Sequence, residues 1–449
     1  MESRRVLIVG GGVAGITAAL RLQSSGFAVT LIEEQKALGG GMLSDAQPTD
    51  PAPSHLPAFL FGSDTATSSL TKELGTAHHI RSDRPMRIRF SREETLSALP
   101  SPRYSRLPGY AMASLLAFRG LGVKDRWRMA SFLERTWEQD PPLQTDLEQQ
   151  TGEEWLRSIG QSEEARRFVW DPLSCFLAGE RIETVSAESY WNVLQRFFIG
   201  RTAGLVYAVS PPGWSTLLLD PAERRLLDAG VSIHSGTRAI HLLTEDERVA
   251  GVALQDGALL KADWYVLALS PHALIALLSD RVLTHYAYFH EILGLVTTPR
   301  LFVSMTFDRT IESQIILLTG GSFQWLMIQP SAVPSGAGSS VWLASVGQPE
   351  HLTRPASELL DLALKDLAAT CPALRNLVPM AHRIVKDSSG TMSVRPGSRH
   401  CRPLATGPFS NCFLTGAWTD TNLPPRVESA IVSAERCAEA VMQCAARAR

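Results

Sequence analysis

The feature that most constrains this chain is a glycine turn close to its start. Residues 6–9 are apolar and lead directly into the motif Gly10-x-Gly12-x-x-Gly15. The apolar residues that follow recur at helical spacing, and a second apolar run covers residues 28–32. A strand, a glycine turn, a helix and a second strand in this order predict the beginning of a parallel α/β sheet.

The spacing around this turn indicates a dinucleotide site. A pyrophosphate approaches the backbone closely at the N-terminal end of a helix, and a Cβ in the turn would block it. Glu33 follows Gly15 by 33 − 15 = 18 residues, where an acid can bind the 2′-hydroxyl of a ribose and would repel a 2′-phosphate. A simple glycine turn with an exposed glutamate is the competing interpretation, but strand, turn, helix and acid together favour dinucleotide binding.

Composition limits the class of protein. The 449 residues suffice for two or three domains, and 43 basic against 45 acidic residues leave a net charge of −2, so nucleic acid is not an expected partner. Apolar residues make up 45% and charged residues 20% of the chain, which excludes a disordered protein. The six cysteines form no C-x-x-C pair, as is typical of reduced thiols. We therefore expect a cytoplasmic protein with no metal site.

Export and membrane insertion are not expected either. Arg4 and Arg5 before an apolar run imitate an export signal, but the glycine turn interrupts that run after four residues. The uncharged stretches 202–219 and 313–349 are broken by Pro, Gly and Ser. Neither supplies the roughly 20 continuous apolar residues that a membrane-spanning helix needs.

Two further segments resemble a known cofactor site. Leu38-Gly39-Gly40-Gly41 follows the second strand, and Leu414-Thr415-Gly416 precedes a long helix near the end of the chain. This combination resembles the two-part FAD site of the amine oxidase and phytoene desaturase superfamily, whose C-terminal segment holds the ribityl chain and isoalloxazine ring. The resemblance implies FAD as the cofactor. It assigns cofactor contacts to Gly10, Gly12, Val13, Ala14, Gly15, Glu33, Gly40, Gly41, Ala239, Gly416 and Val427.

The middle and the end of the chain narrow this resemblance to one branch, the squalene-associated hydroxysqualene dehydroxylases. The similar segments are Trp170-Asp171-Pro172-Leu173, Thr184-Val185-Ser186-Ala187, Ala268-Leu269-Ser270-Pro271, Gln324-Trp325 and Gly416-Ala417-Trp418-Thr419-Asp420-Thr421-x-Leu423-Pro424. They cover nearly the whole chain.

The chain departs from the family pattern at three places. Gly41 stands where many relatives have an Arg or Lys near the pyrophosphate, and Ala417 stands where many have an Asp that faces the ribityl chain. The segment after Asp45 lacks the usual Asp-x-Gly-x-His run and offers only His55 as a counterpart. These departures leave open that the FAD site is weaker than usual or compensated elsewhere.

The resemblance implies an α/β fold in which a Rossmann-like FAD-binding domain, of the GR2 or p-hydroxybenzoate hydroxylase-like type, carries a mixed-sheet substrate domain with a helical insertion. Residues 1–80, 211–285 and 401–449 would form the FAD-binding domain. Residues 81–210, with the helical insertion, and 286–400 would form the substrate domain. Apolar strands that would wall a substrate pocket are expected at residues 302–307, 323–328 and 341–346.

The activity that the resemblance implies is reductive removal of an allylic hydroxyl from hydroxysqualene, with reduced FAD as the electron source and squalene as the product. Ionising the C–O bond requires an acid near the leaving oxygen and a dry pocket. Asp171 and Asp420 are the candidate acids, and caps of turns or helices are their competing interpretation. Trp170, Trp325 and Trp418 could face a cationic substrate, or they could be ordinary core residues.

Two other activities stay open. A carotenoid (phytoene-type) desaturase or isomerase would use oxidised FAD on a polyene, and a flavin-binding partner protein would have no turnover. An amine oxidase ranks lower, because no amine-binding features stand out. An isoprenoid lipid is the expected substrate, and a squalene-forming synthase is a candidate partner.

A membrane contact is the last expectation. Residues 107–123 combine apolar side chains with nearby Lys124, Arg126 and Arg128. Such a segment could be an ordinary packed helix, or it could rest peripherally on the inner face of the cell membrane.

Overall fold

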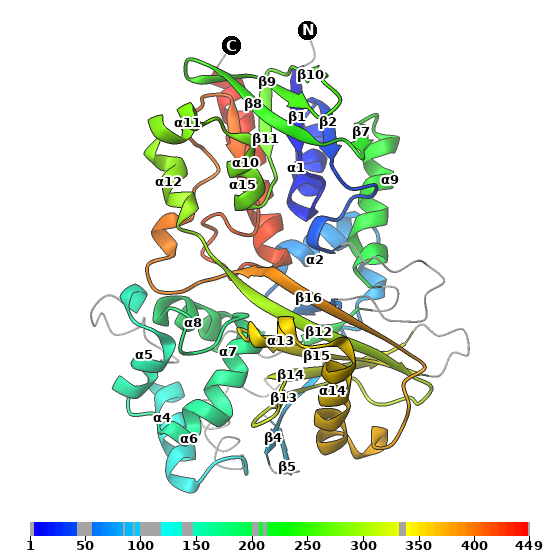
Figure 1. Cartoon of the computed structure of the whole chain (residues 1–449), viewed down its shortest axis with the longest axis vertical. Coiled ribbons are helices and arrows are strands. Elements are labelled where there is room, and N and C mark those ends of the chain that lie inside the picture. The colour runs from blue at the N-terminus through cyan, green and yellow to red at the C-terminus, as the bar shows by residue number, and fades with distance from the viewer. Residues whose placement is uncertain are drawn as a thin grey trace.

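The computed structural model describes residues 4–42, 56–83, 86–92, 95–98, 118–136, 147–199, 206–209, 213–331 and 338–447. The chain forms an upper body, which carries both described chain ends, and a lower body built on a second sheet (Figure 1). His55 and residues 107–117 lie outside the described residues, so the expectations placed on them stay untested.

The upper sheet has five parallel strands in the order β17-β11-β1-β2-β7. Their bounds are β1 Arg5–Val9, β2 Ala28–Glu33, β7 Ser232–Ser235, β11 Trp264–Leu267 and β17 Cys412–Leu414. Helix α1 (Val13–Ser24) connects β1 to β2, so the predicted strand, turn, helix and strand are confirmed. Helices α9 (Asp220–Asp228) and α15 (Val427–Arg447) pack beside α1 on the same face.

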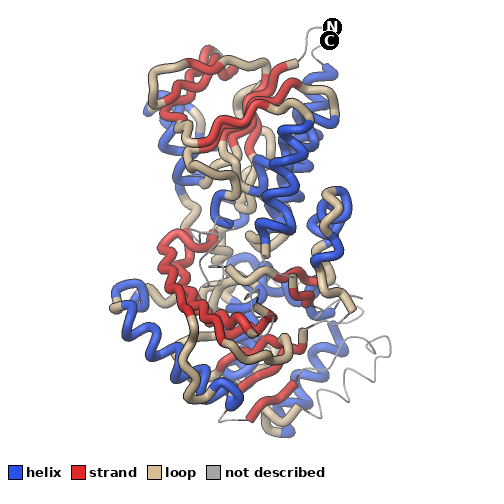
Figure 2. The backbone as a smooth tube through the Cα atoms, turned by 90° about the vertical axis from the view of Figure 1, so that its right-hand side faces the viewer, coloured by secondary structure: helices blue, strands red, loops and turns tan. Residues whose placement is uncertain are grey.

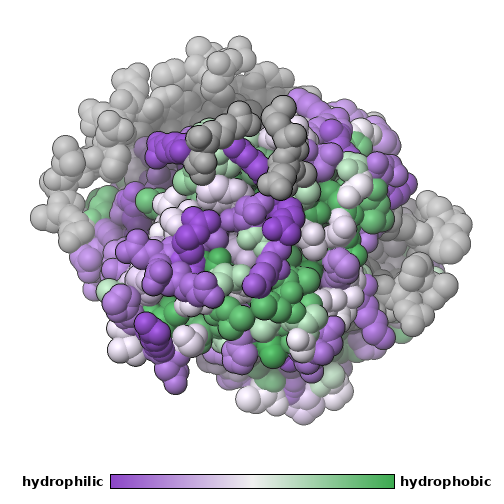
Figure 3. Space-filling model, turned by 90° about the horizontal axis from the view of Figure 1, so that it is seen from above, coloured by the Kyte–Doolittle hydropathy of each residue, from purple (hydrophilic) through white to green (hydrophobic). Residues whose placement is uncertain are grey.

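Alternation along β1 explains why this sheet is covered on both faces. Val6 and Ile8 join the core beneath α1 and α15, whereas Leu7 and Val9 join the core on the opposite face. An antiparallel sheet of order β10-β9-β8 and three short helices belong to that second face. Their bounds are β8 Ala239–Glu245, β9 Arg248–Leu254, β10 Leu259–Leu260, α10 Pro271–Leu277, α11 Asp280–His285 and α12 Ala287–Leu293. Seen from above, hydrophilic and hydrophobic residues are mixed over the described surface at this end of the molecule (Figure 3).

The lower sheet is mixed and has seven strands in the order β16-β12-β15-β14-β13-β4-β5. Their bounds are β4 Arg87–Arg92, β5 Thr95–Ala98, β12 Thr297–Phe307, β13 Gln314–Leu318, β14 Trp325–Pro330, β15 Ser339–Val346 and β16 Ala381–Met392. Only the β4–β13 pair is parallel among these neighbours. The strands expected at residues 302–307 and 341–346 are confirmed as parts of β12 and β15, and the strand expected at residues 323–328 corresponds to β14, which begins two residues later at Trp325.

Helices cover both faces of the lower sheet as well. A helical layer packs on one face and supplies the helices that the sequence predicts within residues 81–210. Its members are α4 Val123–Thr136, α5 Gly152–Ser158, α6 Glu163–Ala165, α7 Asp171–Leu177 and α8 Ala187–Leu194. The other face packs against α14 (Ala356–Thr370), and α13 (Glu350–Thr353) lies at the sheet edge formed by β12 and β16.

The two bodies are joined by long segments. Strands β12 and β16 rise from the lower sheet toward the upper body (Figures 1 and 2). A small ladder of β3 (Phe59–Phe61) with β6 (Val206–Ala208), followed by α2 (Thr65–Glu73), lies at the same junction. The expected domain boundary at residue 286 falls before α12, whose Phe289 and Ile292 belong to the upper core. Within the described part of the chain, no helix is long and apolar enough to cross a membrane.

Candidate cofactor and active site

The glycine turn forms a crowded loop at the carboxyl end of β1. Gly10 has φ +105°, and a Cβ there would lie 2.4 Å from the carbonyl oxygen of Ala268, which follows β11. A Cβ on Gly15 would lie 1.9 Å from the carbonyl oxygen of Gly10. Gly12 occupies the N-cap position of α1, and no side chain accepts a hydrogen bond from the first N–H groups of the helix there. The loop therefore leaves the positive end of α1 uncapped, as a diphosphate site requires.

Glu33 is buried beside this loop. Its carboxylate accepts the N–H of Gly11 at 2.6 Å and the N–H of Gln35 at 2.9 Å. These bonds use two of roughly four acceptor positions of a carboxylate, so capacity remains for the hydroxyls of a ribose. The N–H of Thr237 donates to the carbonyl oxygen of Glu33 at 2.8 Å, which brings Ala239 at the start of β8 near the same edge. The interpretation of Glu33 as an exposed surface acid is excluded.

A second glycine run packs against the first. The N–H of Gly39 donates to the carbonyl oxygen of Gly11 at 2.8 Å. Gly40 has φ +54°, and a Cβ there would come within 3.1 Å of the Cα of Gly12. A Cβ on Gly41 would meet open space. The two runs together form a cradle of bare backbone, which fits an extended diphosphate.

The C-terminal segment reaches the same edge of the sheet. The N–H of Thr415 donates to the carbonyl oxygen of Leu267, the last residue of β11, at 3.2 Å. Because β1 and β17 flank β11, Gly10 and Gly416 follow the carboxyl ends of strands on either side of it. Ligands of open α/β sheets bind at this edge. The structure thus brings the two parts of the expected cofactor site together.

A hydroxyl network fastens the loop after β17 to α15. The Oγ of Ser433 lies 3.0 Å from Thr415 Oγ1 and 2.7 Å from Thr419 Oγ1. One turn earlier, the Oγ of Ser429 lies 2.7 Å from Thr421 Oγ1. All five side chains are buried. Sequence reasoning missed this network, although two serines at i and i+4 lie on one face of a helix and could have indicated it.

Asp171, the first candidate acid, is buried and forms an ion pair with a partly exposed arginine. Its Oδ2 lies 2.9 Å from Nη2 of Arg181, and its Oδ1 accepts the N–H of Ile182 at 3.1 Å. Burial raises the pKa of Asp171, and the nearby charge of Arg181 opposes that shift. The indole N–H of Trp170 donates to Gln161 Oε1 at 3.0 Å, deep in the core. These contacts favour the structural interpretation of both residues, and their functional roles stay predictions.

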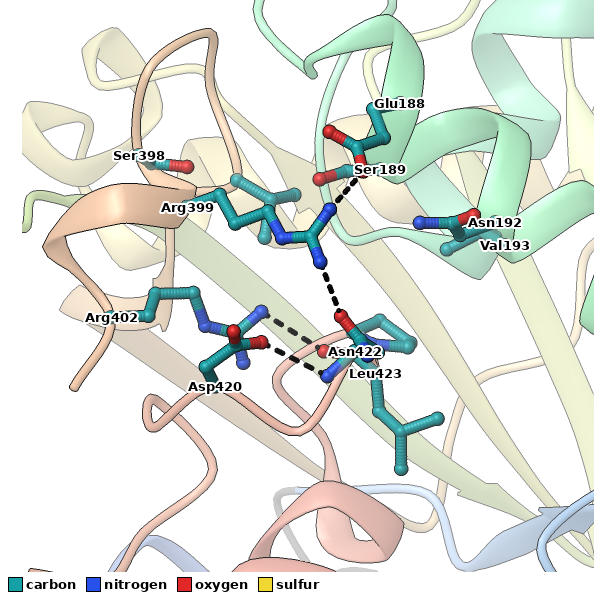
Figure 4. A pocket seen from close by; sticks show the side chains of 12 residues that line it. Glu188, Ser189, Asn192, Val193, Ser398, Arg399, Arg402, Asp420, Asn422 and Leu423 are labelled. Carbon is teal, nitrogen blue, oxygen red and sulfur yellow. Dashed lines mark hydrogen bonds and ion pairs between the residues drawn. The ribbon is translucent and has the colours of Figure 1, made fainter. Parts of the chain in front are cut away.

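Asp420, the second candidate acid, lines a cleft between α8 and the loop before α15, together with other polar and charged residues (Figure 4). Its Oδ1 accepts the N–H of Asn422 at 3.2 Å, and Asn422 has φ +58°. The carboxylate therefore closes a tight turn. Arg399 spans the cleft, since it pairs with Glu188 of α8 and donates to Asn422 Oδ1 at 2.9 Å.

The three candidate tryptophans do not lie together. The indole N–H of Trp418 donates to the carbonyl oxygen of Leu269 at 2.8 Å, and its ring packs in the upper core. A Cβ on Gly416 would lie 2.5 Å from that indole nitrogen, so the packed ring by itself requires this glycine. Trp170 and Trp325 belong to the core between the helical layer and the lower sheet. These contacts favour the core interpretation of Trp418.

Trp325 is part of a row of aromatic rings that sequence reasoning did not assemble. Neighbouring ring centroids in this aromatic row lie between 4.2 and 5.9 Å apart. Arg426, which precedes α15, stands 4.6 Å above the ring of Phe61 at one end. The row thus runs from the lower sheet to the start of α15 and Val427. Its members are Phe302, Trp325, Phe176, Phe59, Phe61 and Phe197.

One further acid lies at the Arg426 end of the aromatic row. Asp64 Oδ2 accepts the N–H of Phe61 at 2.9 Å. Burial raises the pKa of Asp64 to about 6, and the charges of Arg426 and Arg196 oppose this shift. No local sequence pattern marks Asp64, because these charged partners come from distant parts of the chain.

The fold and this site define a protein that binds a flavin dinucleotide, and comparisons with known proteins agree. The family described as flavin containing amine oxidoreductase matches residues 13–442. Zeta-carotene desaturase of Synechocystis sp. is 22% identical over 483 aligned positions, which cover 99% of this chain and 98% of that protein. The 15-cis-phytoene desaturase of Solanum lycopersicum is 24% identical and covers 98% of this chain and 77% of that protein.

Solved structures show the same fold. Putrescine oxidase bound to putrescine superposes with a TM-score of 0.75 at 15% identity, covering 98% of this chain and 99% of that one. Cyclohexylamine oxidase from Brevibacterium oxydans gives a TM-score of 0.72 at 17% identity and covers 100% of both chains.

The chain therefore belongs to the flavin containing amine oxidoreductase family. It is an FAD-dependent oxidoreductase, and its fold is the α/β fold expected from the sequence. Relatives named as carotenoid desaturases cover nearly the whole chain, whereas the narrower resemblance to hydroxysqualene dehydroxylases is not confirmed. The individual cofactor contacts assigned to all eleven residues, from Gly10 to Val427, stay predictions.

Proposed function

We propose that this enzyme desaturates a long isoprenoid of the carotenoid type. The observation that carries the proposal is the aromatic row, which leads through the interior to the start of α15. Two carotenoid desaturases that align with 98–99% of the chain support the same substrate class. Bound FAD supplies the two-electron acceptor that such a reaction needs.

The side chains of the lower body would bind and orient the substrate and exclude water. Five rings of the aromatic row are buried and Phe59 is partly buried, so the row is a dry apolar interior, and a conjugated chain would bind along it by displacing part of this packing. Desaturation with FAD as the acceptor requires no protein acid to activate a leaving group. The absence of such a requirement agrees with the structure, in which Asp171 pairs with Arg181 and Asp420 accepts the N–H of Asn422.

Reductive dehydroxylation of hydroxysqualene is a second candidate, and Asp64 favours it. An allylic hydroxyl leaves only when its oxygen is protonated or hydrogen-bonded. With a pKa of about 6, Asp64 keeps a protonated fraction near neutral pH, and it lies beside Phe61 in the aromatic row. The segment from Gly416 to Pro424 resembles the dehydroxylases independently.

Product analysis distinguishes the two candidates. The FAD-loaded protein is incubated in detergent with phytoene and a quinone acceptor, and separately, after reduction, with hydroxysqualene. Desaturation predicts products with fewer hydrogens by mass spectrometry from phytoene only, and Asp64→Asn should leave that activity intact. Squalene formation that Asp64→Asn abolishes would establish the second candidate instead. If neither product forms, both candidates are refuted, and a flavin-binding partner protein without turnover is favoured.

We also propose a peripheral contact with an anionic membrane, from which an isoprenoid could enter. Helix α4 exposes Val123 and Trp127, which are 70% and 57% exposed. Lys124 and Arg128 are exposed on the same helix. Exposed apolar and aromatic side chains next to cations suit the interface of an anionic lipid surface.

A further inference from the structure

Arg402 lies where the chain returns from the lower sheet to the upper one. It directly follows a short helical turn, Arg399–Cys401, and precedes the segment that runs beside β17. Its guanidinium points toward the loop between β17 and α15 (Figure 4). Arg402 therefore connects the crossing segment with the loop that ends at α15.

Four backbone carbonyls of this loop converge on the one guanidinium. Its Nε donates to Trp418 at 3.2 Å, and its Nη1 donates to Leu423 at 3.2 Å. Its Nη2 donates to Ala417 at 3.1 Å and to Thr419 at 2.7 Å. All three nitrogens are engaged, so the bonds fix the peptide planes on both sides of the turn.

Only an arginine can make this set of bonds from one side chain. Its planar fork carries five N–H donors, whereas lysine carries three donors on a single nitrogen. Burial lowers the pKa of Arg402 to about 10, and the charge of Asp420 opposes that shift. The group is thus a cation at neutral pH, and its charge strengthens the bonds to the carbonyl dipoles.

We propose that Arg402 is a positioning residue for the flavin. It holds the loop after Gly416 in the shape that receives the flavin end of FAD, and it fixes the place where α15 begins. The positive end of α15 can stabilise a negatively charged reduced flavin only while it is held there. Arg402 thereby sets both the affinity for FAD and the midpoint potential. The inference rests on FAD as the cofactor and not on the proposed substrate.

The test compares Arg402→Lys, which keeps the charge, with Arg402→Gln and with a matched control. Arg436→Gln is the control, because exposed Arg436 also donates to this loop, at 3.0 Å to the carbonyl oxygen of Asp420. Each variant is purified, stripped of FAD and titrated with FAD by calorimetry. The midpoint potential is measured by spectroelectrochemistry, and the Tm of the FAD-free protein by circular dichroism.

Arg402→Lys should weaken FAD binding by about tenfold or more, because the three N–H donors of lysine cannot serve four carbonyls and at least one charge-assisted bond is lost. Its midpoint potential should become more negative, while the Tm of the FAD-free protein stays within about 2 °C of wild type. Arg436→Gln should bind FAD within about twofold of wild type, since exposed bonds contribute little.

Three results would overturn the proposal. The first is wild-type affinity for FAD and a wild-type midpoint potential in Arg402→Lys. This result would overturn the proposal even if Arg402→Gln failed to fold. Another is an equal loss of affinity in Arg436→Gln, which would indicate a general charge effect. The third is a large fall in the Tm of FAD-free Arg402→Lys, which would assign the residue to overall stability. No substrate enters these measurements, so a wrong substrate class cannot affect them.

Discussion

Replacing Glu428 should loosen the junction between α2 and α15. Its carboxylate is 5% exposed and accepts the N–H of Ala66 at 3.0 Å and the N–H of Thr67 at 2.8 Å. It also accepts the hydroxyl of Thr67 at 2.6 Å and pairs with Arg196 at 3.2 Å. Glu428 therefore caps the N-terminus of α2, a helix far from its own in the sequence.

The size of the effect follows from these contacts. Glu428→Gln keeps the shape but loses the charge, and hydrogen bonds to charged groups contribute about 1.5–3 kcal/mol. Glu428→Ala removes this partner from the α2 donors and from Arg196. Removal of one partner from a buried ion pair typically costs about 3–5 kcal/mol of stability. With an unfolding entropy of about 2 cal/mol/K per residue, a loss of 3 kcal/mol lowers the Tm of this chain by about 3 °C.

Two measurements check this prediction. Circular dichroism gives the Tm of the FAD-free variants, and hydrogen exchange reports on the amides of Ala66 and Thr67, which should exchange faster in both variants. Glu439→Gln, an exposed change on the same helix, should stay within about 0.5 kcal/mol of wild type. A Tm of Glu428→Ala within about 1 °C of wild type, with unchanged exchange in α2, would refute the reasoning.

Three further predictions concern the cofactor cradle, Asp64 and the exposed side of α4. Gly15→Ala puts a Cβ 1.9 Å from the carbonyl oxygen of Gly10. Overpacking costs about 1–3 kcal/mol, which should weaken FAD binding about 5- to 150-fold in a fluorescence titration. Wild-type affinity would contradict the proposed cradle. Because burial raises the pKa of Asp64 from 3.8 to about 6, its folded carboxyl keeps a proton that the unfolded one loses. Asp64 should therefore make the free energy of unfolding fall as pH rises from about 4 to 6. In urea unfolding, Asp64→Asn should lack this part of the pH dependence. The same pH dependence in wild type and Asp64→Asn would contradict this prediction. Trp127→Ser should reduce flotation with anionic liposomes, and absence of wild-type binding would end the membrane proposal.

The cofactor cradle could be predicted from the sequence because its parts act through neighbouring backbone. Gly10 is required by its own φ of +105° and Gly15 by its contact with the carbonyl oxygen of Gly10, both within one turn, and Glu33 ends the adjacent strand. Strand β16 was not predicted, because its residues are polar and mostly exposed or half-buried. It is a strand because β12 pairs with it along nearly its whole length.

The candidate acids show where sequence reasoning stops. The sequence marks Asp171 and Asp420 only through their immediate neighbours, but Asp171 pairs with Arg181 and Asp420 is bound into a turn. The roles of Asp64 and Arg402 depend on contacts with residues that are distant in the sequence. Local spacing carries no information on such contacts, so only the folded chain could identify them.

The proposed function requires that FAD in this protein accept electrons from a polyene isoprenoid. The most direct test mixes the oxidised, FAD-loaded protein with phytoene in detergent without oxygen, and follows the visible flavin absorbance while products are quantified. We predict loss of the oxidised flavin absorbance together with an equal amount of desaturated product. The contradicting result is an unchanged flavin with phytoene, and reoxidation of the prereduced protein by hydroxysqualene with formation of squalene.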